Sequence, residues 1–506
     1  MSTQSTPGID DAGTTDHPSR SDGFVRGISG AIGGPLGDHA TALDRPAGSE
    51  RRFWTAARIV LALTCLALAL HWVQKSPCQD GAWQNNVQYN RFCYTDVLAL
   101  YYAEGLNEGK VPYRDHPVEY PVLTGYFMGA LGLPVHAIGD GDPSINQAQW
   151  FYNLNALVLG ALAVATVAVI LALRRRRPWD AAMFALAPAL LLTATVNWDL
   201  LAIGLAAFGL LAWARRQPAV AGVLLGLAGA AKLWPLFLLG PILVLALRAG
   251  RLRAALTAIG TAVVAVVLVN LQPARAYPEN WGRFFELNTT RPIDWGTLWY
   301  IGRYLDGKIG TNSGRQGPFE WLNANIPTLN IVSYALFGLA CLGVAVLALR
   351  APRRPRLAQL AFLVVAAFLI FSKVWSQQFV LWMLPLVVLA RPKWGAFLAW
   401  QLAEVCYFVA FYGELLGAAT SRPVFPEGVF VLASTLRLAT VVVLCVLVIR
   451  EILHPEQDAV RATYADDPDG GVLDGAPDVG WIDRFRIRPE RPSTLDPEIP
   501  AGTAAR

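Results

Sequence analysis

Carboxylates and aromatic rings that could do chemistry gather in one polar stretch of this sequence, residues 74–153. It holds Tyr94 and Asp96 near its start, and Glu119 followed by Tyr120 further on. Carboxylates donate and accept protons in acid–base catalysis, and tyrosine rings pack on the flat faces of ligands. This stretch is therefore the first candidate for a functional site.

Three short polar clusters interrupt apolar sequence further along the chain. Only six of the 42 basic residues are lysines, so Lys232 and Lys373 stand out in two of the clusters as cations that could bind phosphate. A lysine that snorkels from a helix end is the alternative for both. Asp199, in the remaining cluster, either pairs with Lys232 or caps its turn. The clusters are residues 197–199, 232–235 and 372–378.

Composition points to a membrane protein. Of the 506 residues, 54% are hydrophobic and only 16% are charged, and the mean hydropathy is +0.38. The apolar residues fall in long runs, which is typical of membrane spans. We expect an all-α polytopic membrane protein with membrane lipids, and no nucleic acid, as partners. No metal-ligand spacing, Walker loop or Rossmann fingerprint occurs, so neither a metal nor a cofactor is expected.

Arginines in the short loops orient the chain. The first long apolar run follows a cluster of arginines, so the positive-inside rule places the N-terminus in the cytoplasm and residues 74–153 outside. Arg174 to Arg177 end the next long run and belong inside as well. The apolar stretch 121–138 between the two runs then cannot be a full span. We expect it to form a helix in the outer interface.

The same alternation continues along the chain and predicts twelve spans with both termini in the cytoplasm of a cell membrane. They make up a transmembrane region, 51–452, with external loops at about 74–150 and 272–327. Several spans have only about 15 residues, against about 20 needed to cross a bilayer. Residues 1–50 and 453–506 are rich in polar residues, and we expect both to be disordered tails. The expected spans are 59–73, 151–173, 180–196, 199–214, 218–232, 235–247, 254–271, 328–349, 357–371, 376–390, 394–411 and 429–449.

All three polar clusters fall at outer turns, on the same side as residues 74–153. Ionisable groups are costly at membrane depth and usually mark a site. The cytoplasmic turns, by contrast, are connections of Arg, Pro and Gly. We therefore expect a site at the external membrane surface.

The order of these motifs resembles the integral membrane glycosyltransferases of the GT-C superfamily. The resemblance is closer to family 87, the actinobacterial polyprenyl-phosphate-mannose-dependent α-mannosyltransferases, and covers roughly residues 54–450. In that family a His-Tyr pair often precedes the Leu-Trp segment, where this chain has Gln377, Gln378 and Phe379. The motifs that carry the resemblance are Asp96 and the segments 109–115, 119–123, 197–199, 232–235 and 376–385.

The resemblance implies transfer of a sugar, mannose in that family, from a polyprenyl phosphate to a cell-envelope glycan or glycolipid on the external face. A sugar on phosphate already has a good leaving group, so the protein must supply mainly a base and cations. The resemblance gives the role of base to Asp96, and capping of a helix that starts at Val97 is the alternative. The expected substrate- and phosphate-binding residues are Glu119, Tyr120, Asn197, Asp199, Lys232, Lys373, Gln377 and Gln378.

Other contributors stay open. Tyr101, Tyr102 and His116 could also belong to the site. The second external loop offers arginines that could bind phosphate, and aromatic residues that could stack on a sugar or belong to an interfacial belt. These are Arg275, Arg283, Arg291, Arg303, Trp295, Trp299 and Tyr300. The alternative function is a transporter or flippase of a lipid-linked saccharide, which would need ionisable residues near the middle of the membrane.

Two of the six cysteines, Cys78 and Cys93, fall in the first external loop. Outside the cytoplasm a disulfide can form and persist. Closing this loop would add about 3 kcal/mol of stability by the chain-entropy estimate. We expect these two cysteines to pair, and the other four, which lie in spans, to be small apolar residues.

Overall fold

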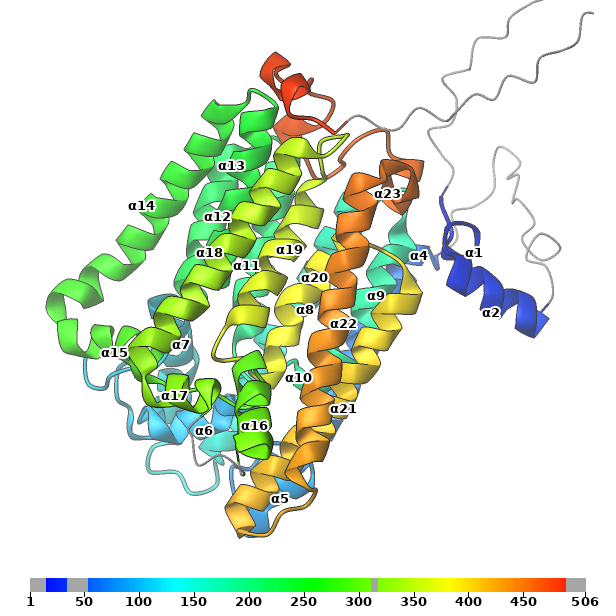
Figure 1. The fold of residues 1–506 in the computed structure, drawn as a ribbon. Helices are drawn as coiled ribbons and strands as arrows, with labels where there is room; N and C mark the ends of the chain where they lie inside the picture. The colour runs from blue at the N-terminus through cyan, green and yellow to red at the C-terminus, as the bar shows by residue number, and fades with distance from the viewer. Residues whose placement is uncertain (1–14, 34–52, 311–316, 488–506) are drawn as a thin grey trace, which may run out of the picture.

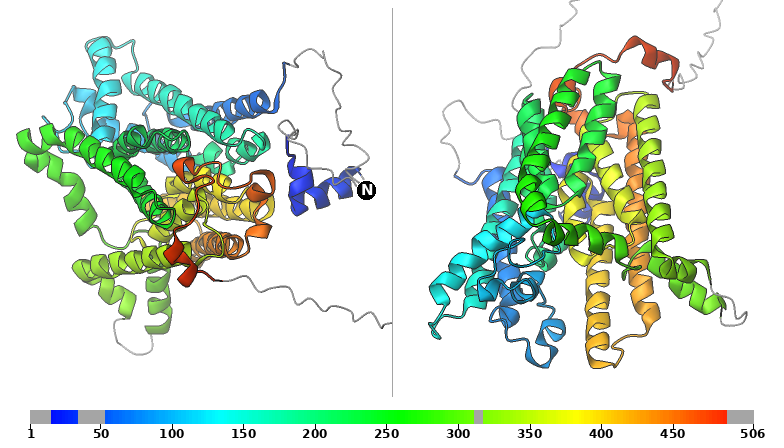
Figure 2. Two further views of the ribbon diagram at one scale, coloured as in Figure 1. Left: turned by 90° about the horizontal axis from the view of Figure 1, so that it is seen from above. Right: turned by 90° about the vertical axis from the view of Figure 1, so that its left-hand side faces the viewer.

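The computed structural model describes residues 15–33, 53–310 and 317–487. These residues form helices, and the part of the chain described contains no strand beyond one isolated bridge between Pro112 and His116. The prediction of an all-α polytopic membrane protein is confirmed. Figures 1 and 2 show the long helices side by side in one bundle.

Within the described residues, seven helices are long and apolar enough to cross a membrane, and shorter apolar helices pack among them. The short ones correspond to the expected spans of about 15 residues. The bundle consists of α4 (Ala56–Lys75), α8 (Gln147–Leu173), α11 (Asp199–Ala214), α12 (Pro218–Ala231), η5 (Trp234–Leu238) with α13 (Leu239–Arg248), α14 (Leu252–Ala276), α18 (Ile326–Arg350), α19 (Leu357–Phe371), η6 (Gln377–Phe379) with α20 (Val380–Ala390), α21 (Trp394–Thr420) and α22 (Glu427–Leu453).

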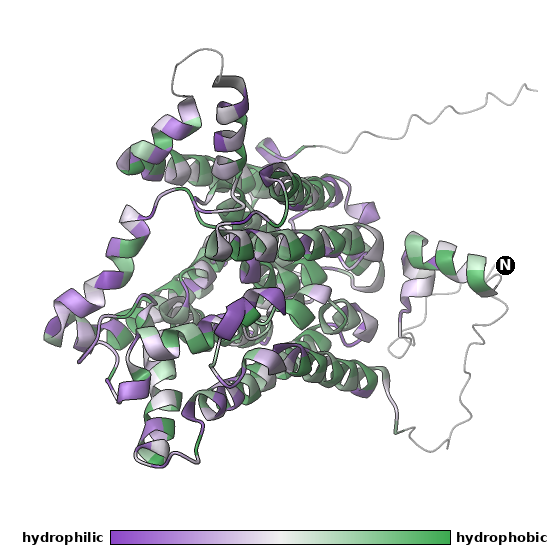
Figure 3. Ribbon diagram, turned by 90° about the horizontal axis from the view of Figure 1, so that it is seen from below, coloured by the Kyte–Doolittle hydropathy of each residue, from purple (hydrophilic) through white to green (hydrophobic). Residues whose placement is uncertain are grey.

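The two ends of the bundle differ. One end, the loop end, carries the polar segments between α4 and α8 and between α14 and α18, and Figure 3 shows these hydrophilic segments in front of the hydrophobic helices. The other, the arginine end, carries the turns with Arg174, Arg248, Arg356 and Arg391. The loop end contains η1 (Ser76–Cys78), η2 (Gln84–Asn86), α5 (Val87–Asn90), α6 (Asp96–Ala103), η3 (Leu106–Glu108), α15 (Pro278–Thr290), α16 (Leu298–Gly310) and α17 (Pro318–Ala324).

The stretch expected to lie in the interface forms α7 (Val122–Gly139). Near its start, the Thr124 hydroxyl donates to the carbonyl of Ala231 at the end of α12 (2.7 Å). At its other end, Gly139 packs directly on Gln147, the first residue of α8. Both contacts are at the loop end of the bundle. Although α7 is long enough to span a membrane, it therefore lies along one end, the arrangement expected of an interfacial helix.

One expected span is broken. Residues 180–196 were predicted as a single helix, but they form short pieces that together still connect the two ends. Pro188 causes the break, because it lacks an N–H group and excludes the helical conformation from the residue before it. Ala187 is accordingly extended. The pieces are η4 (Pro178–Ala181), α9 (Ala182–Ala185) and α10 (Pro188–Thr193).

The C-terminal segment differs from the expectation of a disordered tail. Residues 454–487 lie on the arginine end in short helices, and their aspartates pair with buried arginines of the bundle. Asp458 binds Arg356 (2.7 Å), and Asp478 binds Arg248 (2.7 Å). The short helices are η7 (Pro455–Gln457), α23 (Ala459–Thr463), η8 (Gly471–Leu473) and η9 (Gly480–Arg484).

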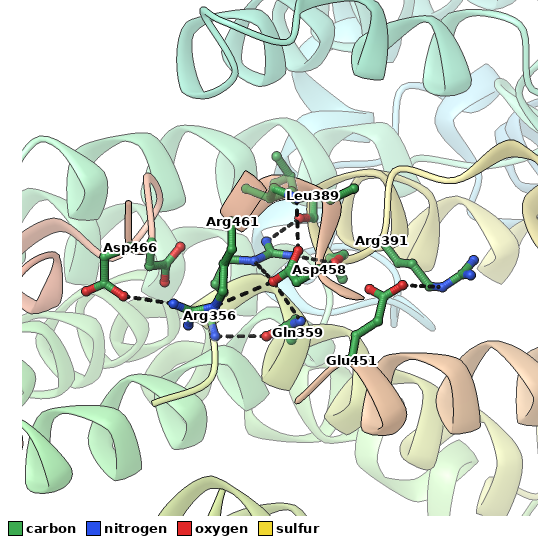
Figure 4. Close-up of polar contacts among 12 residues, drawn as sticks. Arg356, Gln359, Leu389, Arg391, Glu451, Asp458, Arg461 and Asp466 are labelled. Atoms are coloured by element: carbon green, nitrogen blue, oxygen red, sulfur yellow. Dashed lines mark hydrogen bonds and ion pairs between the residues drawn. The ribbon is translucent and has the colours of Figure 1, made fainter. Parts of the chain in front are cut away.

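The physical reason for this difference is charge complementarity. Buried arginines need counter-charges, and an Asp-rich segment supplies them although it is too polar to form a core of its own. Figure 4 shows Asp458 between Arg356 and Arg461, and Arg391 beside Glu451. Residues 488–506 of the expected tail lie outside the described residues.

A shorter part of the expected N-terminal tail is also helical. It forms α1 (Pro18–Ser21) and α2 (Gly23–Gly33), and the Asp22 carboxylate accepts a hydrogen bond from the backbone N–H of Trp394 at the start of α21 (2.7 Å). Residues 1–14 and 34–52 lie outside the described residues.

Candidate active site

A cavity of about 710 Å³ lies at the loop end, between the segment that precedes α7, α15, α18, α19 and the loop that leads into α20. Its wall brings together residues that are far apart in the sequence. Seven of the nine expected site residues line it, whereas Asp199 and Gln377 do not. The seven are Asp96, Glu119, Tyr120, Asn197, Lys232, Lys373 and Gln378.

Asp96 is the first residue of α6, but it does not cap that helix. The cap is Thr95, whose hydroxyl accepts a hydrogen bond from the backbone N–H of Val97 (3.2 Å). The backbone N–H of Asp96 donates to the carbonyl of Val196 (2.6 Å), which fixes its main chain against the turn before α11. The capping alternative is therefore wrong, and the carboxylate of Asp96 is left to face the cavity.

The surroundings of Asp96 make it a stronger base than an ordinary aspartate. Burial raises the pKa of its carboxyl to about 6, against a hydrogen bond from Tyr94 that lowers it. The charge of Glu119 raises the pKa further, and the charge of Lys232 opposes it. A carboxylate with a pKa near the working pH is well suited to take a proton from a hydroxyl group.

Lys232 is paired and buried. Its ammonium lies 3.2 Å from Oδ1 of Asp199 and 4.3 Å from the centre of the Tyr120 ring, and Lys232 is only 8% exposed. It therefore does not snorkel to the surface. Asp199 also accepts a hydrogen bond from the indole N–H of Trp382 (2.9 Å), so it holds Lys232 in place from behind the cavity wall.

The turn before α11 is capped by the side chain of Asn197 and not by that of Asp199. The side-chain oxygen of Asn197 accepts from the backbone N–H of Asp199 (3.0 Å). Its amide nitrogen lies 3.5 Å from the Tyr120 hydroxyl. Asn197 thus connects the start of α11 with the loop that carries Tyr120.

A second cation lies across the cavity. The ammonium of Lys373 donates to the backbone carbonyl of Arg291 (2.6 Å), and both residues line the cavity. Burial, together with the charge of Arg291, lowers the pKa of Lys373 to about 8, so it remains largely charged at neutral pH. The carbonyl of Lys373 accepts from the backbone N–H of Asp294 (2.9 Å).

Aromatic rings form a large part of the remaining wall. The Trp382 ring stacks with those of Trp234 and Phe379, with centroid distances of 5.9 and 3.9 Å. Further along, Tyr334 and Phe285 line the cavity and are also 57% and 45% exposed. The apolar wall therefore continues to the outer face of the bundle, between α15 and α18.

Several candidates lie elsewhere. Gln377 is buried outside the cavity, and Arg275 does not line it. The remaining open candidates pair with neighbours instead: Arg283 with Glu286, Arg303 with Glu320, His116 with Glu104, Tyr101 with Phe151 and Tyr102, Trp295 with Phe411 and Phe430, Trp299 with the carbonyl of Phe371, and Tyr300 with Glu427.

The structure adds residues that the sequence analysis missed. Glu104, which is buried, accepts a hydrogen bond from the backbone N–H of Glu119 (3.2 Å) and so holds the loop that carries it. Asp294 lines the cavity beside Lys373, and burial raises its pKa. Asn330 and Ser333 line it from α18. Asn330 and Ser333 could have been predicted from the sequence, because two polar residues three positions apart on an apolar span share one face of the helix.

The expected disulfide between Cys78 and Cys93 is formed, with the two Cα atoms 5.7 Å apart. It joins the end of α4 to the segment just before Tyr94 and Asp96. Within the residues described, no group of three His, Cys, Asp or Glu side chains is arranged as metal ligands.

Residues 144–376 match the model of glycosyltransferase family 87. The matched region contains Asn197, Asp199, Lys232 and Lys373, and it ends before Gln378. A comparison with curated proteins finds no match. Together with the apolar helices, the family match supports a membrane glycosyltransferase that is similar to family 87.

Proposed function

We propose that this protein transfers a sugar from a polyprenyl-phosphate donor to a cell-envelope glycan or glycolipid, with Asp96 as the general base. Mannose is the sugar that the resemblance to family 87 implies. The observation that carries the proposal is the composition of the cavity. One hollow joins a carboxylate of raised pKa, two lysines and an aromatic wall that reaches the outer face of the bundle.

These groups match the steps of the reaction. The acceptor hydroxyl oxygen attacks the anomeric carbon of the donor sugar while Asp96 takes the hydroxyl proton. The bond between that carbon and the phosphate oxygen breaks, and its electron pair leaves with polyprenyl phosphate. Lys232 and Lys373 stabilise the charge that develops on the phosphate, because they are already in place before the bond breaks.

The aromatic wall favours a lipid-linked donor. Trp234, Trp382 and Phe379 form an apolar surface next to Lys232. The opening beside Tyr334 would let an isoprenoid chain stay in contact with lipid while its phosphate enters the cavity. Aromatic rings bury a large apolar area and suit such a chain.

In this proposal the loop end lies outside the cytoplasm. The arginines of the other end favour a cytoplasmic position under the positive-inside rule, and the disulfide at the loop end suits an oxidising compartment. Both termini would then be cytoplasmic, and the membrane would be the cell membrane.

Transport of a lipid-linked saccharide is the competing function. A transporter needs a path between the two ends of the bundle. Here every residue of α20 is buried, and this helix continues from the cavity to the arginine end. The packing favours an enzyme with one external site.

The test supplies the purified protein with radiolabelled polyprenyl-phosphate mannose and an acceptor fraction from the cell envelope. We expect Asp96→Asn to lower the transfer rate by about 100-fold or more, as for the loss of a general base.

The matched control is Asp142→Asn. Asp142 is an exposed aspartate between α7 and α8 that lies outside the cavity, and this variant should transfer at the wild-type rate. Undiminished transfer by Asp96→Asn would refute the role of Asp96. If the wild-type protein transfers no sugar from any lipid-linked donor but moves the lipid-linked saccharide across vesicle membranes, the protein is a transporter.

A further inference from the structure

We infer that Arg437 is a positioning residue for the donor phosphate, because its guanidinium holds the loop 372–378 that carries Lys373 and Gln378. The inference rests on the proposed function. Arg437 and its partner Glu404 both follow the region that matches family 87, and neither lines the cavity.

Arg437 is fully buried in α22, and Glu404 is buried in α21. Nε of Arg437 lies 3.1 Å from Oε2 of Glu404, and the Trp400 indole N–H donates to the other carboxylate oxygen (3.0 Å). The central carbon of the guanidinium lies over the rings of Trp375 and Tyr407, at 4.3 and 4.1 Å from their centres. A carboxylate and two aromatic rings therefore hold the cation.

The other two nitrogens of this guanidinium hold the loop. One donates to the carbonyl of Trp375 (3.0 Å) and the other to the carbonyl of Ser376 (3.0 Å). Ser376 is extended and precedes η6, and its carbonyl also accepts from the backbone N–H of Phe379 (3.2 Å), so the guanidinium is a second donor to that carbonyl. Buried carbonyls need a partner, and a guanidinium offers donors in a planar fork that can bind two at once.

The loop held in this way faces the cavity. Ser376, which carries one of the anchored carbonyls, lines it together with Gln378, and Lys373 lines it two residues before Trp375. On the opposite side, the carbonyl of Lys373 accepts from Asp294. The backbone that carries Lys373 is thus held at two places, by Asp294 in the second polar loop and by Arg437, while the Lys373 ammonium itself donates to the carbonyl of Arg291.

Stability alone gives a poor account of this ion pair. Charges are costly at membrane depth, and a well-packed neutral pair is often as stable as a buried ion pair. A neutral pair would, however, lose both contacts to the loop. The charge pair therefore has its clearest use in placing residues 372–378.

The test uses the double variant Arg437→Met with Glu404→Gln, which removes both charges and leaves a side chain that can still accept from Trp400. Two readouts follow the loop and the ligand: hydrogen exchange of the peptide 372–379, and binding of polyprenyl phosphate itself. We expect the peptide to exchange faster and the ligand to bind about tenfold more weakly, the effect of losing about one hydrogen bond to a charged group. In the transfer assay KM for the donor should rise by a similar factor, while kcat stays within about threefold.

The matched control is Arg356→Met with Asp458→Asn, which neutralises another buried ion pair, at the arginine end. It should leave exchange in 372–379 and ligand binding unchanged. If the double variant at Arg437 does not fold, Arg437→Lys keeps the charge but lacks the fork, and it should shift both readouts in the same direction by a smaller factor. Unchanged loop exchange or unchanged binding would overturn the inference. Weakened binding in the variant together with no transfer by wild type would instead overturn the proposed function and leave the role of Arg437 intact.

Discussion

The two ends of the bundle use charge in opposite ways. At the arginine end, buried arginines meet aspartates of the C-terminal segment, as in the pairs of Arg356 with Asp458 and Arg248 with Asp478. At the loop end, Asp96 and Lys373 line a cavity and are held mainly through their backbones or by a backbone carbonyl. Charges paired with each other build structure, as Lys232 and Asp199 also do in the cavity wall, and Asp96 and Lys373, which face the hollow, remain available for a ligand.

The largest expected effect is a loss of stability when a buried ion pair at the arginine end is broken. Arg356→Ala leaves buried Asp458 with only the more distant Arg461 (3.6 Å) as a counter-charge, which should lower the free energy of unfolding by about 3 kcal/mol, the lower end of the range for breaking a buried ion pair. Thermal unfolding in detergent measures the change. The exposed Arg353→Ala is the control and should cost less than about 1 kcal/mol, because exposed ion pairs contribute little. Equal losses for the two variants would mean that the buried pairs at this end do not stabilise the fold.

A smaller effect, on binding rather than stability, is expected at the loop end. Lys373→Met removes a cation from the cavity wall, so KM for the lipid-linked donor should rise about 10- to 100-fold, the range for a hydrogen bond to a charged group. The melting temperature should change little. Steady-state kinetics with varied donor concentration measure the change, and an unchanged KM would remove Lys373 from the phosphate site.

Much of the candidate site followed from the sequence because charge and hydropathy act locally. The arginine pattern placed Asp96, Lys232 and Lys373 on one side of the membrane, and the structure brings all three to one cavity. The shape of the cavity did not follow. Trp295 and Trp299 pack inside the loop end, because the composition of a loop does not say which of its rings face a hollow.

The other misses have identifiable causes. The helix expected at 180–196 is broken at Pro188. This proline is visible in the sequence, but the expected helix was based on the apolar run alone. The order of residues 454–487 depends on aspartates that pair with arginines far away in the chain, which a composition rule cannot detect. The contacts of Arg437 with Trp375 and Ser376 likewise join segments about 60 residues apart, so only the folded structure reveals them.

The central claim is that Asp96 takes the proton, and the pH dependence of transfer tests it most directly. Burial raises the pKa of Asp96 to about 6, and the ionised form is the active one. The folded protein then holds this proton more tightly than the unfolded chain does. The contribution of Asp96 to the free energy of unfolding is therefore largest below pH 3.8, the ordinary pKa of an aspartate, and is lost as the pH rises through about 6. Activity should change in the opposite direction.

We therefore predict that kcat/KM is highest near pH 7. It falls above about pH 8, where Lys373 loses its proton and no longer stabilises the phosphate, and it falls about tenfold per pH unit below a midpoint near 6. Asp96→Asn should show only residual transfer, without this midpoint. A wild-type profile that stays flat down to pH 5, or a midpoint that persists in the residual activity of Asp96→Asn, would contradict the assignment of Asp96 as the base.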